Sequence, residues 1–134
     1  MLLNLSTLEL HRGRADAAKG LAEQVLRMQT QAIGPRHPEV ASALTTLGQA
    51  EFVAKDYVNA AGHFTQAIDI LQTMLGDTHP ALVEPLGGLA GTLAAQQNSA
   101  KAAETYRRAI AIRRAQFGAD DPVATDLAAR LAKL

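Results

Sequence analysis

Gly34-Pro35-Arg36-His37-Pro38 is the stretch that decides the fold, because it recurs twice further along the chain. The second copy is Gly76-Asp77-Thr78-His79-Pro80, and the third is Gly118-Ala119-Asp120-Asp121-Pro122. The closing prolines stand at positions 38, 80 and 122, so both intervals are 42 residues long. A fixed period of this length is the sequence signature of a repeat architecture.

Each copy has the residues that end one helix and begin the next. Glycine suits the left-handed position that closes a helix, and proline suits the first helical position, where its missing N–H is not needed. The residue before proline is pushed out of the α region, which suits a position at or beside a helix cap. The expected closing residues are Gly34, Gly76 and Gly118, and the expected capping residues are His37, His79 and Asp121.

Between these stretches each unit has room for two helices, A and B, joined by a tight turn. The turns are expected at residues 12–14, 54–56 and 96–98, which contain glycine, aspartate and asparagine. Apolar residues recur at three- and four-residue steps, as a buried helix face requires. The sequence predicts seven helices, at about residues 2–12, 15–33, 38–54, 57–75, 80–96, 99–117 and 122–133. They form one domain over residues 1–134, with repeats at about 1–37, 38–79 and 80–121 and a final helix at 122–134.

Composition excludes several classes of function. Lys plus Arg and Asp plus Glu number 13 each, so the chain lacks the basic excess that non-specific binding to nucleic acid or an anionic membrane needs. The absence of cysteine excludes disulfides, thiolate metal sites and cysteine nucleophiles. No stretch approaches the roughly 20 apolar residues of a membrane span, and the amino terminus lacks the basic region of a signal peptide. We therefore expect a cytoplasmic protein with no nucleic-acid or membrane partner.

The sequence also lacks the motifs that are typical of catalytic and metal-binding sites. The chain has no nucleophile elbow, phosphate-binding glycine loop or paired-carboxylate motif. His37 and His79 occupy equivalent linker positions, which indicates a structural role. His11 and His63 are isolated and lack metal-ligand spacing, and Asp120-Asp121 is interpreted as a helix N-terminal cap pair. We expect no enzyme activity, no catalytic residue, no metal and no cofactor.

The middle unit carries the residues of a known family. Leu44-x-x-Leu47-Gly48, followed by Tyr57-x-x-Ala60, Phe64 and Ala67, resembles the tetratricopeptide repeat. The 42-residue period with its Leu-Gly-x-x-His-Pro linker resembles the kinesin-light-chain subtype, which is also widespread in bacterial signalling and scaffold proteins. The resemblance covers essentially the whole chain. It implies an all-α, right-handed solenoid of about three helix pairs plus a C-terminal capping helix.

The resemblance also implies where a partner binds. In this family the A helices line a concave face that receives an extended peptide or a partner helix. In the kinesin-light-chain subtype an asparagine of helix A grips the ligand backbone. The equivalent residues here are Asn4, Thr46 and Gly88, so only the first copy keeps the amide. The function implied is non-enzymatic binding of a protein in this groove, as a scaffold.

Helical spacing selects the A-helix residues that would face such a groove. The predicted groove residues are Asn4, Thr7, His11, Ser42, Thr45, Thr46, Gln49, Val53, Glu84, Gly88, Gly91, Asp126 and Arg130. The alternative is that they form only the solvated sides of helices. Gly87, Gly88 and Gly91 stand out, because a glycine inside a helix costs about 0.5–1 kcal/mol relative to alanine. They indicate either a side-chain-free floor for a bulky ligand residue or a second subunit's helix, or a locally loose or kinked helix.

The two ends of the chain suggest further roles. The sequence enters the repeat inside helix A with no linker stretch ahead of it, so the first helix pair is expected to be exposed or part of a longer array. An exposed face with Leu2, Leu5, Leu8 and Leu10 would be a surface for a homo-oligomer. The last helix, with Val123, Leu127, Leu131 and Leu134 on one side, is expected to cap the array. Two alternatives to the scaffold therefore stay open, a self-assembly module and a regulatory segment of a larger signalling protein.

Overall fold

The computed structural model describes residues 14–134, and every regular element in this range is helical. The helices are α2 (Ala15–Ile33), α3 (Pro38–Val53), α4 (Tyr57–Leu75), the short 3-10 helix η1 (Pro80–Leu82), α5 (Val83–Ala95), α6 (Ser99–Phe117) and α7 (Pro122–Ala132). The all-α prediction is confirmed. The helix predicted at 2–12 lies outside the described residues. No helix within residues 14–134 has the length and apolar character needed to cross a membrane.

One predicted helix differs from the structure. Residues 80–96 were expected to form a single α-helix, but the segment starts as η1 and becomes α-helical only at Val83. In an uninterrupted helix from residue 80, the backbone nitrogen of Pro85 would have to donate to the carbonyl of Ala81, and proline has no N–H. With the α-helix starting at Val83, Pro85 falls in its first turn, where no donor is needed. The proline therefore explains the change of helix type.

The recurring linkers form the predicted caps. Nδ1 of His37 accepts a hydrogen bond from the Glu39 N–H at 3.1 Å, and Nδ1 of His79 accepts one from the Ala81 N–H at 3.0 Å. The closing glycines have φ values of +87°, +99° and +95°, as expected for residues that end a helix. Their ψ values of 163–170° place them in a region that is essentially restricted to glycine, rather than in the left-handed helical region.

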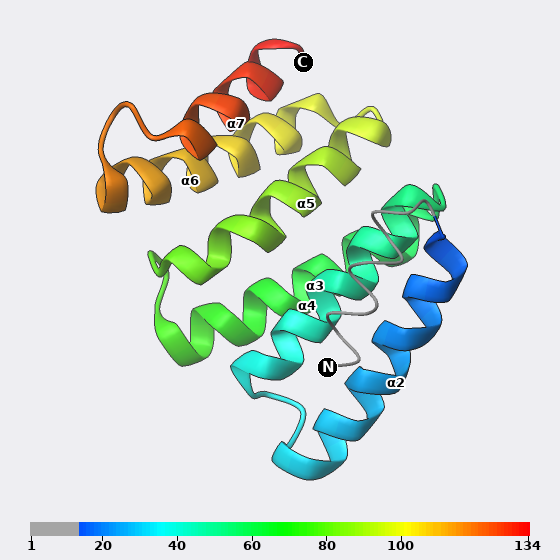
Figure 1. Cartoon of the computed structure of the whole chain (residues 1–134). Helices are drawn as coiled ribbons and strands as arrows, with labels where there is room; N and C mark the ends of the chain where they lie inside the picture. Colours follow the sequence, from blue (N-terminus) through cyan, green and yellow to red (C-terminus); the bar gives the residue numbers. More distant parts are fainter. Residues whose placement is uncertain (1–13) are drawn as a thin grey trace.

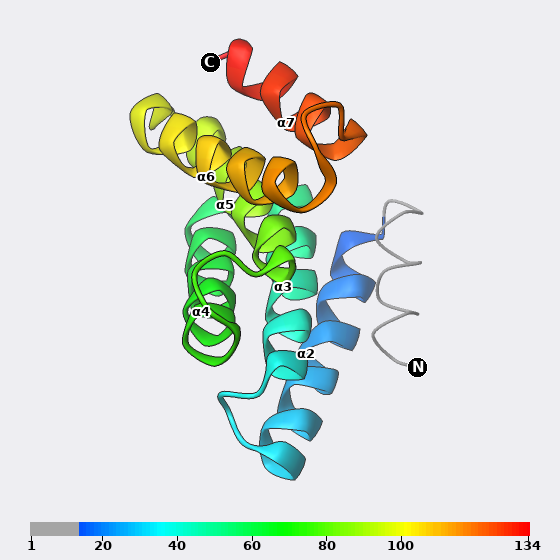
Figure 2. The same cartoon turned by 90° about the vertical axis from the view of Figure 1, so that its left-hand side faces the viewer.

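From α2 to α7, consecutive helices pack against each other, and the A helices α3 and α5 also touch directly. Figure 1 shows α5 between the group formed by α2, α3 and α4 and the pair formed by α6 and α7. Figure 2, turned by 90°, shows the same succession of helices from the side. The core between the layers contains Leu44, Ile68, Leu82, Leu86, Tyr106 and Ile110. The arrangement is an α-solenoid, in which each pair of helices is covered by the next.

Phe64 of α4 joins two A helices at one point. Its side chain is 1% exposed, and its ring lies against Gly48 of α3 and Gly88 of α5. A Cβ atom added at Gly48 would lie 2.9 Å from the ring, and one added at Gly88 would lie closer still. Contacts between carbon atoms are favourable only at about 3.5–4.0 Å, so this packing requires glycine on both sides of the ring.

The turns from helix A to helix B close with a residue in the left-handed conformation. Lys55 and Gln97 both have φ of +63°. In the first of these turns the Asp56 N–H donates to the Glu51 carbonyl at 2.8 Å. In the second, the equivalent bond from Asn98 to Leu93 is 2.9 Å long. These turns fall where the sequence predicts them, and neither uses glycine at its left-handed position.

Candidate functional site

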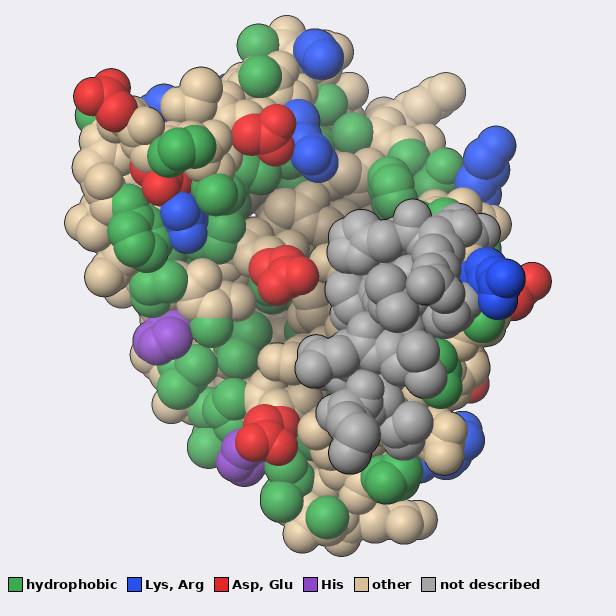
Figure 3. All heavy atoms as spheres, viewed as in Figure 1, with side chains coloured by type: hydrophobic (Ala, Val, Ile, Leu, Met, Phe, Trp, Pro, Cys, Tyr) green, Lys and Arg blue, Asp and Glu red, His purple; other side chains and the backbone are tan. Residues whose placement is uncertain are grey.

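The A helices enclose a hollow of about 690 Å³ between α3, α5 and α7. Seven of the predicted groove residues line it, namely Gln49, Val53, Glu84, Gly88, Gly91, Asp126 and Arg130. The face that Figure 1 presents is drawn with all its atoms in Figure 3, where hydrophobic, acidic and basic side chains surround a hollowed centre. The structure thus brings residues from three helices, distant in the sequence, to one concavity.

Two predicted groove residues are corrected by the structure. Thr45 and Thr46 are only 5% and 7% exposed, so they do not lie on an open surface. Their hydroxyls donate back to the carbonyls of Ala41 and Ser42 at 2.9 and 3.2 Å, which satisfies them within α3. Helix α3 is covered by neighbours on most sides of its first three turns, and three-four spacing alone does not identify the exposed strip of such a helix.

The remaining predicted residues divide into two groups. Ser42 is exposed, but it does not line the hollow. Its hydroxyl lies 3.5 Å from the Pro38 carbonyl. Asn4, Thr7 and His11 lie outside the described residues, so their place in a groove stays a prediction.

The three glycines of α5 have different surroundings. Gly88 was predicted to offer a bare floor, but the ring of Phe64 occupies the space next to it, so its small size serves packing within the chain. A Cβ at Gly87 would meet Leu127 at 3.5 Å, and one at Gly91 would meet the Tyr106 hydroxyl at 3.6 Å, both ordinary contacts. Gly87 and Gly91 line the hollow, and α5 continues through all three positions. The floor thus stays a prediction for Gly87 and Gly91, whereas packing against Phe64 accounts for the glycine at position 88.

Large apolar side chains line the hollow and remain exposed. Phe52, Val53 and Val123 are 38%, 48% and 41% exposed. Phe52 also packs against Tyr57, with ring centroids 5.6 Å apart. Helical spacing does not select Phe52 as a groove residue, and it predicts Val123 on the packing side of the last helix. An aromatic residue at the end of an A helix, followed by a turn, was the available signal for Phe52.

The polar side chains that line the hollow make few contacts with one another. Nε2 of Gln49 donates to Oε1 of Glu84 at 2.9 Å, which links α3 to α5. Arg130 pairs with Asp126 one turn earlier in α7, with Nε 3.1 Å from Oδ2. Glu84 has no cation within ion-pair distance among residues 14–134. The carboxylate of Glu84 is therefore held in place by an amide but not neutralised by the described part of the chain.

Arg113 lines the hollow as well, but its charge is paired with Asp121. The guanidinium donates to both carboxylate oxygens of Asp121, at 2.9 and 2.7 Å, and also stacks over the Phe117 ring at 4.0 Å. Asp121 accepts a further bond from the Ala124 N–H at 2.9 Å, which caps α7 as predicted. Arg113 holds the pKa of Asp121 below its usual range. In turn, the hydrogen bonds to Asp121 raise the pKa of Arg113.

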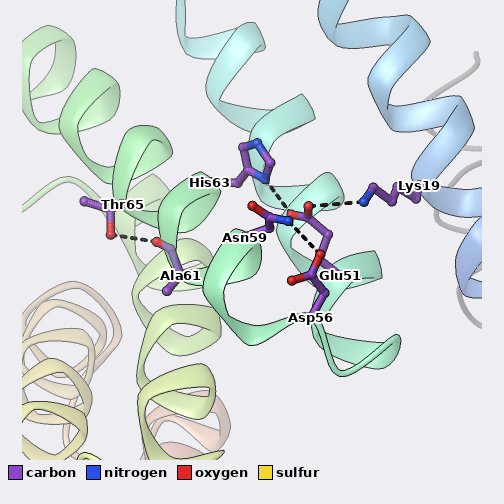
Figure 4. Close-up of polar contacts among 7 residues, drawn as sticks. All are labelled: Lys19, Glu51, Asp56, Asn59, Ala61, His63 and Thr65. Atoms are coloured by element: carbon purple, nitrogen blue, oxygen red, sulfur yellow. Dashed lines mark hydrogen bonds and ion pairs between the residues drawn. The ribbon is translucent and has the colours of Figure 1, made fainter. Parts of the chain in front are cut away.

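A second polar cluster lies on the other side of α3, between α2 and α4. Glu51 is 2% exposed, and its carboxylate contacts Nδ1 of His63 and lies 3.6 Å from Nζ of Lys19 (Figure 4). Nearby, the Asn59 amide donates to Asp56 at 2.7 Å and lowers the pKa of that carboxyl. The sequence indicates an isolated His63, whereas the fold places it against the buried carboxylate of Glu51. Within the described range, no group of three or more His, Cys, Asp or Glu side chains is arranged to hold a metal ion.

Comparisons with known proteins agree with this fold. A family model described as "Tetratricopeptide repeat" matches residues 1–73 and 51–115. No curated protein sequence matches the chain significantly. Among solved structures, a putative kinesin light chain with nearly identical TPR-like repeats from Podosopora anserina has a TM-score of 0.89 at 21% identity, over 98% of this chain and 63% of that one.

Two further structures are similar. A point-substituted form of the same Podosopora anserina protein has a TM-score of 0.88 at 21% identity, over 98% of this chain and 62% of that one. BtubC (BKLC) from P. vanneervenii has a TM-score of 0.80 at 19% identity, over 98% of this chain and 57% of that one. At this level of identity the likeness shows the fold alone. The chain spans less than two thirds of the length of each of these proteins.

Proposed function

The chain belongs to the tetratricopeptide repeat family, and from this premise we propose that it is a non-enzymatic scaffold that holds a segment of another protein. Repeats of this family generally mediate protein–protein interaction. The proposed binding site is the hollow between α3, α5 and α7. The segment held there is a peptide or a partner helix.

The observation that carries this proposal is the exposed apolar lining of the hollow. Phe52, Val53 and Val123 are large apolar side chains that the chain itself leaves partly uncovered. Binding sites are typically concave and mostly apolar, with a few placed polar groups and a volume of about 300–1,000 Å³. A volume of about 690 Å³ lies within that range. Covering these side chains with a ligand would remove apolar surface from water, which is the main driving force of association.

The polar groups of the hollow favour binding over catalysis. Its ionisable lining residues are Glu84, Asp126, Arg113 and Arg130. Both arginines are paired with carboxylates, and no serine, threonine or histidine of the described chain lines the hollow. A nucleophile with an adjacent base, which covalent catalysis needs, is therefore not formed by the lining residues of 14–134.

The test compares a valine that lines the hollow with an exposed valine that does not. Val53 lines the hollow, whereas Val58 is 77% exposed on α4 and does not. Peptides would be selected from a random display library on the immobilised protein, and their affinities measured by fluorescence anisotropy. Val53 is 48% exposed in the free protein, so covering the rest of it contributes about half of the 1.5–3 kcal/mol of a full burial. Val53→Gln is therefore expected to weaken binding about three- to tenfold. Val58→Gln is expected to bind as the wild type does, and equal affinities for both variants would refute the proposal.

The self-assembly alternative has two candidate surfaces, the floor at Gly87 and Gly91 within the described residues and a leucine-rich face outside them. Both surfaces stay predictions, as does the regulatory role in a larger signalling protein, and the leucine-rich face is the one predicted with Leu2, Leu5, Leu8 and Leu10. Light scattering over a wide concentration range separates self-assembly from scaffolding. A mass that rises with concentration would favour self-assembly, and a constant monomer mass would favour the scaffold.

A further inference from the structure

Building on the proposed function, we propose that the segment held in the hollow is basic as well as apolar. A lysine or arginine of the partner protein pairs with Glu84, close to an apolar side chain that packs on Phe52, Val53 and Val123. The hollow thus selects a cationic, apolar peptide segment and disfavours an acidic one.

The Glu84 carboxylate is placed to receive a positively charged group. Glu84 lies in the first turn of α5, is exposed and lines the hollow. Its Oε1 accepts from Gln49 at 2.9 Å, while its Oε2 has no hydrogen-bond partner among residues 14–134. An ionised carboxylate accepts several hydrogen bonds, so one oxygen is open to a donor. The amide of Gln49 holds the carboxylate in position without consuming its charge.

The balance of charge around the hollow also favours a basic ligand. Two arginines line it, but Arg113 is bound by both oxygens of Asp121 and Arg130 is bound by Asp126. An acidic ligand would have to compete with these carboxylates for the arginines. A basic ligand finds in Glu84 a carboxylate that the described chain leaves without a counter-ion. Complementary charges at an interface determine which partner is accepted more than they determine total affinity.

Charge and apolar surface occur together in the hollow. Glu84 shares the lining of the hollow with the exposed side chains of Phe52, Val53 and Val123. A lysine or arginine has an apolar stem that can lie along such surface while its charged end reaches a carboxylate. One short segment can therefore satisfy both features of the hollow, since side chains spaced by a few residues reach neighbouring positions on one side of a peptide helix or strand.

The experiment selects peptides in parallel on three proteins, the wild type, Glu84→Lys and Glu39→Lys. Glu39 is a matched control because it is also an exposed acidic residue in the first turn of an A helix, but it does not line the hollow. Wild type and Glu39→Lys are expected to enrich peptides with Lys or Arg near an apolar residue. Glu84→Lys is expected to enrich Asp or Glu at that position instead.

A charge exchange then measures the pairing by fluorescence anisotropy. Changing the basic residue of a selected peptide to glutamate is expected to weaken binding to the wild type roughly tenfold, and Glu84→Lys is expected to restore it. Peptides that lose affinity with Val53→Gln but change less than about twofold with Glu84→Lys would refute this inference and leave the proposed function standing. Peptides enriched in acidic residues on the wild type would also refute it. Binding that does not respond to Val53→Gln, or no binder at all, would refute both.

Discussion

Replacing Gly88 with alanine adds a single methyl group, and the structure predicts that the protein becomes less stable. An alanine in a helix is normally favoured over glycine by about 0.5–1 kcal/mol. At this position, however, the added carbon would lie well inside van der Waals contact with the ring of Phe64. The ring has little room to withdraw, because a Cβ on its other side, at Gly48, would already be 2.9 Å from it.

The expected loss in the free energy of unfolding follows from two opposing effects, overpacking of the core and higher helix propensity. Overpacking a filled core costs typically about 1–3 kcal/mol, and Phe64, at 1% exposed, is part of such a core. After the gain in helix propensity is subtracted, we expect Gly88→Ala to lose about 1–2 kcal/mol. For a domain of 134 residues this corresponds to a fall in Tm of about 3–8 °C.

Gly91→Ala, three residues further along the same helix, is the matched control. Its added carbon would meet the Tyr106 hydroxyl at 3.6 Å, an ordinary contact, so only the gain in helix propensity applies. We expect its Tm to rise by about 2–4 °C. Both variants are compared with wild type by circular dichroism during heating and by urea unfolding.

The decisive outcome is the sign of the change at position 88. If Gly88→Ala raises Tm as Gly91→Ala does, the inferred packing of the Phe64 ring between the two A helices is wrong. A double-mutant cycle gives a second check, because Phe64→Leu makes room for the methyl group. In the Phe64→Leu background, Gly88→Ala is expected not to lower the free energy of unfolding. If the two substitutions have additive effects on this free energy, the proposed contact between the Phe64 ring and Gly88 is contradicted.

Three further predictions concern the caps, the turns and the buried carboxylate. Arg113 lowers the pKa of Asp121 in the folded protein, so ionised Asp121 stabilises the fold at pH values above its unfolded pKa near 3.8. This stabilisation is lost as the pH falls through the lower pKa of Asp121 in the folded protein. The Tm deficit of Asp121→Asn is thus expected to be full at neutral pH and to shrink below about pH 4, and a deficit independent of pH would contradict this. Lys55 and Gln97 each have a left-handed backbone conformation with φ of +63°, which glycine adopts without strain. Lys55→Gly and Gln97→Gly are therefore each expected to raise the free energy of unfolding in urea by about 0.5–1 kcal/mol. A lower free energy of unfolding for both variants would refute the left-handed conformation. His63→Ala removes a partner of Glu51, which is 2% exposed, and is expected to lower the free energy of unfolding in urea by about 1–3 kcal/mol. A change within about 0.5 kcal/mol would mean that this contact contributes little to stability.

The sequence predicts the architecture well because its strongest signals are local. Glycine, a residue with a capping side chain and proline act within a few positions of each other, so the linkers can be recognised without tertiary information. The caps at His37 and His79 and the positive φ of the glycines follow from this. The start of α5 was also open to prediction, since Pro85 lies inside the stretch that was assigned to one helix.

The site is less predictable because it depends on contacts between repeats. Gln49 and Glu84 are predicted groove residues, but their hydrogen bond joins two helices whose relative position no local pattern encodes. Thr45 and Thr46 have the same helical spacing as true lining residues and are buried, because α3 is covered on several sides. The role of Gly88 depends on a ring from another helix, 24 positions earlier in the chain.

The packing of Phe64 has a consequence for the repeats as building blocks. The residues equivalent to Phe64 in the neighbouring units are Ala22 and Tyr106, and the residues 42 positions after Gly48 and Gly88 are Ala90 and Arg130. The large ring and its two glycines are therefore matched to one location in the array. Although the units share one period, one unit cannot replace another in the array without a change in packing. Moving the second unit into the third position would carry Gly48 along with Phe64, but it would set the ring against the side chain of Arg130 in place of Gly88.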